Sequence, residues 1–218
     1  MTPPPVAVPT WHPVEAAPVL PSAAPEEDVE YKAAIPLRVQ VPSVDFDSEA
    51  VVPKKATNVI TEWTKAMNDA YNGVVQIFGP WDSALVWDST VKGGGLIGTD
   101  VETNGRIIGH TAPWGARDQK TGDPILGVFN PLHGVKEGDI VAITTKAGTL
   151  CYNVKKKDTD TPKDKLNVVY PKDEVHPGIV YLITCYRPED WPDEYATVNQ
   201  LVLTLELNQQ STNAGTCW

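Results

Sequence analysis

The chain has 218 residues, with 28 Asp or Glu against 18 Lys or Arg, and a formal net charge of −10 at pH 7. This acidity disfavours a nucleic-acid partner, because phosphate binding needs a basic surface. Proline (20 residues) and glycine (16 residues) are too abundant for a helical bundle and favour a β protein with many turns. No apolar run reaches the roughly 20 residues of a transmembrane segment, and the N-terminus lacks a signal-peptide pattern.

Residues 1–34 are expected to form a disordered arm or an extended tether. Eight prolines from Pro3 to Pro25 interrupt every possible helix or central strand in this segment. Alanine, valine and glutamate fill the intervals without an apolar period.

Residues 35–208 are predicted to form the folded domain, and residues 209–218 a loose polar C-terminal tail. Residues 37–41 alternate apolar and polar side chains, as a half-buried strand does. A helix is expected over 57–71, where apolar residues recur at steps of three and four. Further short apolar runs, separated by turn-forming residues, predict strands at 84–87, 106–109, 125–129, 140–144, 149–154, 167–170, 179–185 and 201–207. This pattern predicts a mainly β fold, a closed or nearly closed barrel of about eight strands.

Three cysteines, Cys151, Cys185 and Cys217, leave at least one thiol without an intrachain partner. Cys151 lies within a predicted strand and is expected to be a packed core thiol. Cys217 is expected to be exposed and able to cross-link two chains. No C-x-x-C pair exists and the acidic clusters match no calcium loop, so no metal is expected.

Two predicted strands end in reactive side chains. His110 follows the strand at 106–109, and Cys185 closes the strand at 179–185. A cysteine is nucleophilic as its thiolate, and a nearby imidazole can take up the thiol proton and later protonate a leaving amine. Since the chain has four histidines and three cysteines, the residues alone do not select this pair.

The surrounding motifs together resemble the sortases, cysteine transpeptidases of Gram-positive bacteria. Tyr181–Cys185 is similar to the T-L-x-T-C motif of that family, with tyrosine in place of the first threonine. Ile107–His110 resembles the histidine strand, and residues 132–140 resemble the L-x-x-G-D turn. The similarity spans residues 35–208 and is nearest to actinobacterial class E-like sortases; a phage-encoded relative also fits it.

The resemblance implies a sortase-type barrel and a transpeptidation that uses no metal or organic cofactor. Cys185 would attack the Thr–Gly carbonyl of an LPXTG-like sorting signal to form a thioester, and His110 would protonate the departing amine. Thr184 and nearby backbone N–H groups would help to form the oxyanion site. The implied partners are a protein or peptide with a C-terminal sorting signal and an amine acceptor, such as a cell-wall precursor or a pilin lysine; water could replace the amine.

One position departs from the family pattern. Sortases carry an arginine where this chain has Gln200, whose amide donates a hydrogen bond but brings no charge. Losing a charged donor at an oxyanion costs on the order of 3 kcal/mol. Arg187, two residues beyond Cys185, is hypothesised to substitute, and the alternative is that it faces solvent. Trp114 and Trp191 lie in loops that form either walls of a peptide groove or ordinary surface.

Two alternatives stay open. Gln200 favours a catalytically impaired sortase-like barrel that acts as a peptide-binding or structural module. The C-x-R run at Cys185–Arg187 fits an L,D-transpeptidase, but the Ser-His-Gly run expected before that cysteine is missing. The resemblance implies an extracytoplasmic or cell-envelope location, whereas the sequence shows no membrane anchor, so the location is not determined.

Overall fold

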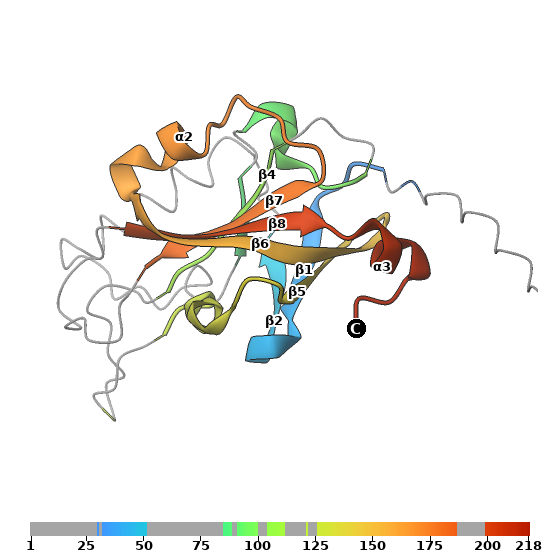
Figure 1. Ribbon diagram of the computed structural model, residues 1–218, viewed down its shortest axis with the longest axis horizontal. Helices are drawn as coiled ribbons and strands as arrows, with labels where there is room; N and C mark the ends of the chain where they lie inside the picture. Colours follow the sequence, from blue (N-terminus) through green and yellow to red (C-terminus); the bar gives the residue numbers. More distant parts are fainter. Residues whose placement is uncertain are drawn as a thin grey trace, which may run out of the picture.

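The computed structural model describes residues 30, 32–51, 85–88, 91–99, 104–111, 121, 126–186 and 199–218. Within these ranges eight strands close into a barrel in the order β1-β2-β3-β4-β7-β8-β6-β5 (Figure 1). The strands are β1 Pro36–Val41, β2 Phe46–Val51, β3 Leu85–Trp87, β4 Gly105–Ile108, β5 Ile140–Thr145, β6 Gly148–Pro162, β7 Ile179–Cys185 and β8 Asn199–Leu207. The predicted fold class, a mainly β closed barrel of about eight strands, is confirmed.

Short helical segments connect the strands. They are η1 Pro42–Val44, η2 Lys92–Gly95, η3 Asn130–Gly134, η4 Lys163–Lys165, α2 Leu166–Val169 and α3 Gln209–Ala214. Among the described helices, none combines the length and apolar character needed to cross a membrane. The helix predicted at 57–71 lies outside the described residues.

Most strand pairs are antiparallel, but β4 and β7 run parallel, as do β2 and β3. The barrel closes where β1 pairs with β5, and the long strand β6 connects β5 to β8. Because parallel strands point the same way, the residues that follow β4 and the last residues of β7 lie at the same edge of the sheet.

Alternating side chains along the strands build two apolar layers. Val180 and Leu182 of β7 face the barrel interior, where they pack with Leu201, Leu203 and Leu205 of β8. The residues between them face outward: Tyr181, Ile183 and Val202 form a second cluster with Tyr170, packed against Ile108, Leu166 and Ile179. The β6–β7 connection, which contains α2, therefore covers part of the outer face of β4, β7 and β8.

A buried arginine fastens this connection to the sheet. Arg106 of β4 is 1% exposed and donates hydrogen bonds to Asn104, to Asn167 and to the Tyr170 carbonyl. The Tyr170 hydroxyl in turn donates to Asp158 at 2.7 Å. The strand predicted at 167–170 is wrong, because α2 and Tyr170 occupy this segment as a cover over the barrel. The strand predicted at 125–129 is also wrong over its described part, where residues 126–127 have no regular structure and residues 128–129 form a turn.

The C-terminal segment differs from the predicted loose tail. Asn208 caps α3 by accepting a hydrogen bond from the Ser211 N–H, and Gly215 ends the helix with a φ of 69°. The buried Thr212 hydroxyl accepts a hydrogen bond from the Cys151 N–H at 2.9 Å. These contacts hold α3 against β6.

A disulfide joins Cys151 of β6 to Cys217. This corrects the expectations of a free core thiol at Cys151 and of an exposed, chain-linking Cys217, which is only 8% exposed. The physical reason is that α3 turns the chain back onto the barrel, which brings two cysteines 66 residues apart into bonding distance.

Candidate active site

The parallel register of β4 and β7 brings His110 and Cys185 to the same edge of the barrel. The register runs from Gly105 opposite Val180 to Ile108 opposite Ile183. The Gly109 N–H donates to the Ile183 carbonyl at 3.1 Å, which extends the parallel pattern one residue beyond β4. His110 and Cys185 each lie two residues beyond the last pair, so the same register, if continued, would place them opposite each other at this edge.

Two threonines bind these segments together. The Thr111 and Thr184 hydroxyls lie 2.7 Å apart, and Thr111 also donates to the Cys185 carbonyl. Both threonines are 2% exposed, so water competes little for these hydrogen bonds. Thr111, the residue after His110, is therefore hydrogen-bonded to the backbone of Cys185.

Two glycines allow the segment 126–129 to pack against the histidine. The His110 carbonyl accepts a hydrogen bond from the Phe129 N–H, and the Thr111 carbonyl accepts one from the Gly127 N–H, both at 2.7 Å. A Cβ atom at Gly127 would lie 2.4 Å from the His110 carbonyl oxygen, and one at Gly109 would lie 2.7 Å from the Phe129 ring. Sequence reasoning missed Gly127, although a glycine inside an apolar run is a known sign of close backbone approach.

The His110 ring is buried, and its surroundings favour the neutral form. The residue is 4% exposed. Burial, and after it the positive charge of Lys163, together lower the pKa of His110 from 6.5 to about 4. At neutral pH the imidazole is therefore uncharged and can accept a proton.

Cys185 is half-buried and carries a free thiol. Since Cys151 and Cys217 are joined, Cys185 is the one unpaired cysteine among the three in the sequence. Figure 1 shows β7, the strand that ends at Cys185, between β4 and β8.

Gln200 lies directly opposite Cys185 in the antiparallel pair of β7 and β8. Opposite residues of such a pair have Cβ atoms about 5 Å apart on one face of the sheet. On its other side Gln200 pairs with Thr161 of β6. The Gln200 amide is thus within reach of a group bound at Cys185, and it carries no charge.

Residues 99–203 match the family model of the sortase domain. The chain carries a sortase domain. The matched range contains β4 and β7, and with them His110, Thr184, Cys185 and Gln200. No curated protein matches this chain in sequence.

Several solved structures resemble the chain, each at low identity. Sortase A from Corynebacterium diphtheriae, a lid mutant, has 16% identity, covering 84% of this chain and 73% of that chain, with a TM-score of 0.46. Sortase A from Listeria monocytogenes has 17% identity, covering 86% and 99%, with a TM-score of 0.46. Sortase C-1 from Actinomyces oris has 16% identity, covering 78% and 72%, with a TM-score of 0.44.

Three predicted site residues of this sortase domain, Trp114, Arg187 and Trp191, lie outside the described residues. The segment that leads to Arg187 is anchored at Tyr186, whose N–H donates to the Asn199 carbonyl at 3.0 Å. The Tyr186 ring stacks on His133 with centroids 5.9 Å apart. No group of three or more side chains suited to a metal occurs in the part of the chain that the structure describes.

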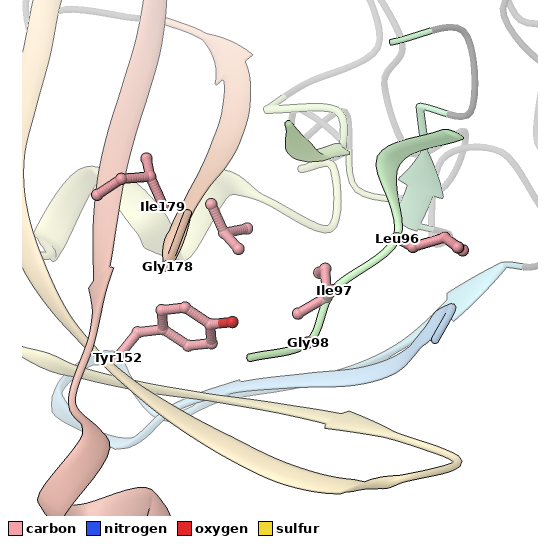
Figure 2. Close-up of a pocket in the computed structure, with 7 residues that line it drawn as sticks. Leu96, Ile97, Gly98, Tyr152, Gly178 and Ile179 are labelled. Atoms are coloured by element: carbon pink, nitrogen blue, oxygen red, sulfur yellow. The ribbon is translucent and has the colours of Figure 1, made fainter. Parts of the chain in front are cut away.

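A small pocket lies at the other end of the sortase barrel. It is lined by Leu96, Ile97, Gly98, Tyr152, Gly178, Ile179 and Val180, and Figure 2 shows the Tyr152 hydroxyl pointing toward Ile97. Burial raises the pKa of Tyr152, so its hydroxyl stays protonated. Because β7 starts beside this pocket and ends at Cys185, the pocket is separate from the Cys185–His110 edge.

Proposed function

We propose that this sortase domain is a cysteine transpeptidase or hydrolase that cleaves the Thr–Gly bond of an LPXTG-like sorting signal. The proposal is supported by the single free thiol, Cys185, which lies at the same edge of the sheet as the buried neutral imidazole of His110. A nucleophile next to a base that is uncharged at neutral pH is the arrangement that acyl transfer needs.

In the proposed reaction His110 accepts the proton of the Cys185 thiol as the sulfur attacks the scissile carbonyl. The tetrahedral oxyanion then collapses, the C–N bond breaks, and the imidazolium returns its proton to the departing amine. The resulting thioester is attacked by an amine acceptor or by water, which passes a proton to His110. The new amide or acid leaves as Cys185 recovers its thiol.

The proposed partners follow from this chemistry and remain proposals for this chain. They are a protein or peptide with a C-terminal sorting signal and an amine such as a cell-wall precursor or a pilin lysine. The Cys151–Cys217 disulfide supports action in an oxidising, extracytoplasmic compartment, where such bonds persist. We also propose that Trp114 and Trp191 form walls of the peptide groove.

The oxyanion needs hydrogen-bond donors, and we propose that backbone N–H groups near Thr184 and the side chain of Arg187 supply them. Arg187→Ala should then lower kcat/KM about a hundredfold or more, whereas Gln200→Ala should change it little. Steady-state kinetics on a sorting-signal peptide measures both variants. The opposite ranking would assign the donor role to Gln200.

The test of the reaction is turnover of a fluorescence-quenched peptide that contains an LPXTG-like signal, with mass spectrometry of the thioester. Wild-type protein should gain the mass of the acyl fragment, and Cys185→Ala should not. His110→Ala should block turnover, whereas His176→Ala should not, because His176 is exposed and paired with Glu174 at 3.4 Å. A wild-type protein that forms no thioester would contradict the proposal.

A second candidate function is a peptide-binding or structural module with impaired catalysis. The uncharged Gln200 opposite Cys185 favours it. Saturable binding of the same peptide without cleavage would select this alternative.

A further inference from the structure

Lys163 lies at the same end of the sheet as the reactive cysteine. It begins η4, directly after β6. The last two residues of β6, Thr161 and Pro162, pair with Gln200 and Asn199 of β8. Because Gln200 pairs in turn with Cys185, the chain reaches Lys163 at the edge that carries the thiol.

Lys163 differs from the lysines near it in the contacts that its ammonium makes within the described residues. Within the part of the chain that the structure describes, its ammonium makes no hydrogen bond or ion pair. Nearby lysines differ in this respect: Lys165 pairs with Asp164 at 3.8 Å and Lys156 with Asp158 at 3.1 Å. The Lys157 ammonium donates to the Val135 carbonyl at 3.0 Å.

The field of Lys163 reaches the candidate site. Its positive charge is the second cause, after burial, of the lowered pKa of His110. A charge that disfavours a cation on the imidazole must favour an anion in the same place. The residue opposite Cys185 offers no charge of its own, because Gln200 is neutral.

We propose that Lys163 supplies positive potential at Cys185, which attracts anionic groups to the thiol and stabilises the oxyanion formed there. The first effect depends only on the position of Lys163. The second effect rests on the proposed acyl-transfer function. Lys163 acts through space, as a positioning charge and not as a nucleophile or base.

Alkylation of Cys185 tests the first effect without any peptide. Iodoacetate is anionic and iodoacetamide is neutral, and both react with the thiolate, so the ratio of their rates cancels the fraction of thiolate. Under non-reducing conditions Cys185 is the single free thiol. The iodoacetate-to-iodoacetamide ratio should fall about two- to fivefold in Lys163→Gln, as expected for charges several ångströms apart near a wet surface.

Two variants control this measurement. Lys163→Arg keeps the charge and should keep the ratio near the wild-type value. Lys165→Gln removes an equal charge from the same short helix and should change the ratio much less, because Lys163 and not Lys165 is the charge that lowers the pKa of His110. An unchanged ratio in Lys163→Gln, or an equal fall in Lys165→Gln, would overturn the inference.

Peptide turnover tests the second effect. Lys163→Gln should lower kcat at least threefold, and Lys163→Arg should restore it. A normal kcat in Lys163→Gln would overturn the oxyanion role. If the wild-type protein shows no turnover while the alkylation ratio still falls in Lys163→Gln, the proposed function fails and the inference about the field at Cys185 stands.

Discussion

Burial of the His110 ring sets the protonation state of its imidazole. An exposed imidazole titrates near pH 6.5, whereas the pKa of this one is lowered to about 4 by burial and by Lys163. The same burial that keeps the ring neutral also makes its protonated form unfavourable. The imidazolium therefore forms easily only when a negative charge arises beside it, as it would during attack by Cys185.

This burial predicts that folding stability depends on pH. Because the folded-state pKa is lowered, the unfolded chain binds more protons between about pH 6.5 and pH 4. Stability should be full above pH 6.5 and should fall by about 2 to 3 kcal/mol by pH 4.5. Urea unfolding of wild-type protein and of His110→Gln measures the effect, which the variant should lack.

Among the described carboxylates, Asp158 has the most strongly lowered pKa, and it changes its charge outside this pH window. Burial opposes the charge of Asp158, but hydrogen bonds from Tyr170, Asp160, Lys156 and Thr161 outweigh it and lower its pKa to about 2. The stability that the ionised Asp158 contributes to the fold is lost only below about pH 4.

If wild type and His110→Gln lost the same free energy of unfolding between pH 6.5 and pH 4.5, the burial of a neutral imidazole would be contradicted.

Gly127 is expected to be intolerant of any side chain. Its added Cβ would meet the His110 backbone at 2.4 Å, and backbone cannot yield as a side-chain tip can. Gly127→Ala should lower the free energy of unfolding by about 1 to 3 kcal/mol and reduce turnover, because His110 must shift. Gly134→Ala is the matched control, since its Cβ would meet only the Val44 side chain, at 3.0 Å. Thermal melts and kinetics that rank the two variants equally would refute this role.

At the level of elements, the edge of the sheet depends on the junction between the end of β7 and the segment that follows β4. The backbone ladder of these strands ends at the Gly109 N–H, and from there the Thr111 hydroxyl makes the connection to Thr184 and Cys185. Parallel strands are distant in sequence, so no short loop holds this edge together. Here the hydrogen bonds of the Thr111 side chain hold the two segments together.

Thr111→Val should therefore loosen the junction. It removes hydrogen bonds to Thr184 and Cys185 and should lower the free energy of unfolding by about 1 to 2 kcal/mol. The alkylation rate of Cys185 should change as well. Thr144→Val breaks a similar threonine pair, Thr144 with Thr149 at 3.0 Å, in the β5–β6 hairpin and should leave that rate unaltered.

A double-mutant cycle separates this contact from general destabilisation. Thr111→Val and Thr184→Val should be non-additive by about 0.5 kcal/mol or more, because they remove the same hydrogen bond. Additive effects would show that the two hydroxyls do not act together.

At the level of the whole molecule, the chain end is part of the barrel's stability. The disulfide closes a loop of 66 residues that includes β7 and β8, and α3 packs on β6. Cross-linking such a loop restricts the unfolded chain and stabilises the fold by about 4 kcal/mol. The strands that carry Cys185 and Gln200 lie within this loop.

Replacing both Cys151 and Cys217 by alanine should lower the free energy of unfolding by about 4 kcal/mol. Urea unfolding under non-reducing conditions measures this change. Reductant should destabilise the wild-type protein by a similar amount and leave the double variant unaffected. A wild-type protein whose unfolding is insensitive to reductant would show that this pair is not bonded in solution.

Local patterns account for what could be predicted. The short apolar runs of β7 and β8, bounded by turn-forming residues, depend on neighbouring residues alone, so they were enough to predict strands and a barrel. The run 167–170 is as apolar as a strand, but Tyr170 and Leu166 bury their side chains from outside the sheet. Whether an apolar run lies in a sheet or over it depends on distant partners, which local pattern does not contain.

The sequence by itself determined the β-rich class, the strands that end at Cys185 and near His110, and the neutral residue at position 200. Only the tertiary structure decided which cysteines pair, which face of the sheet α2 covers, and that Lys163, Gln200 and Cys185 share one edge. The physical reason is that these features depend on interactions over different sequence distances. Side-chain alternation is set by the local backbone, whereas register and barrel closure depend on contacts between residues far apart in the chain.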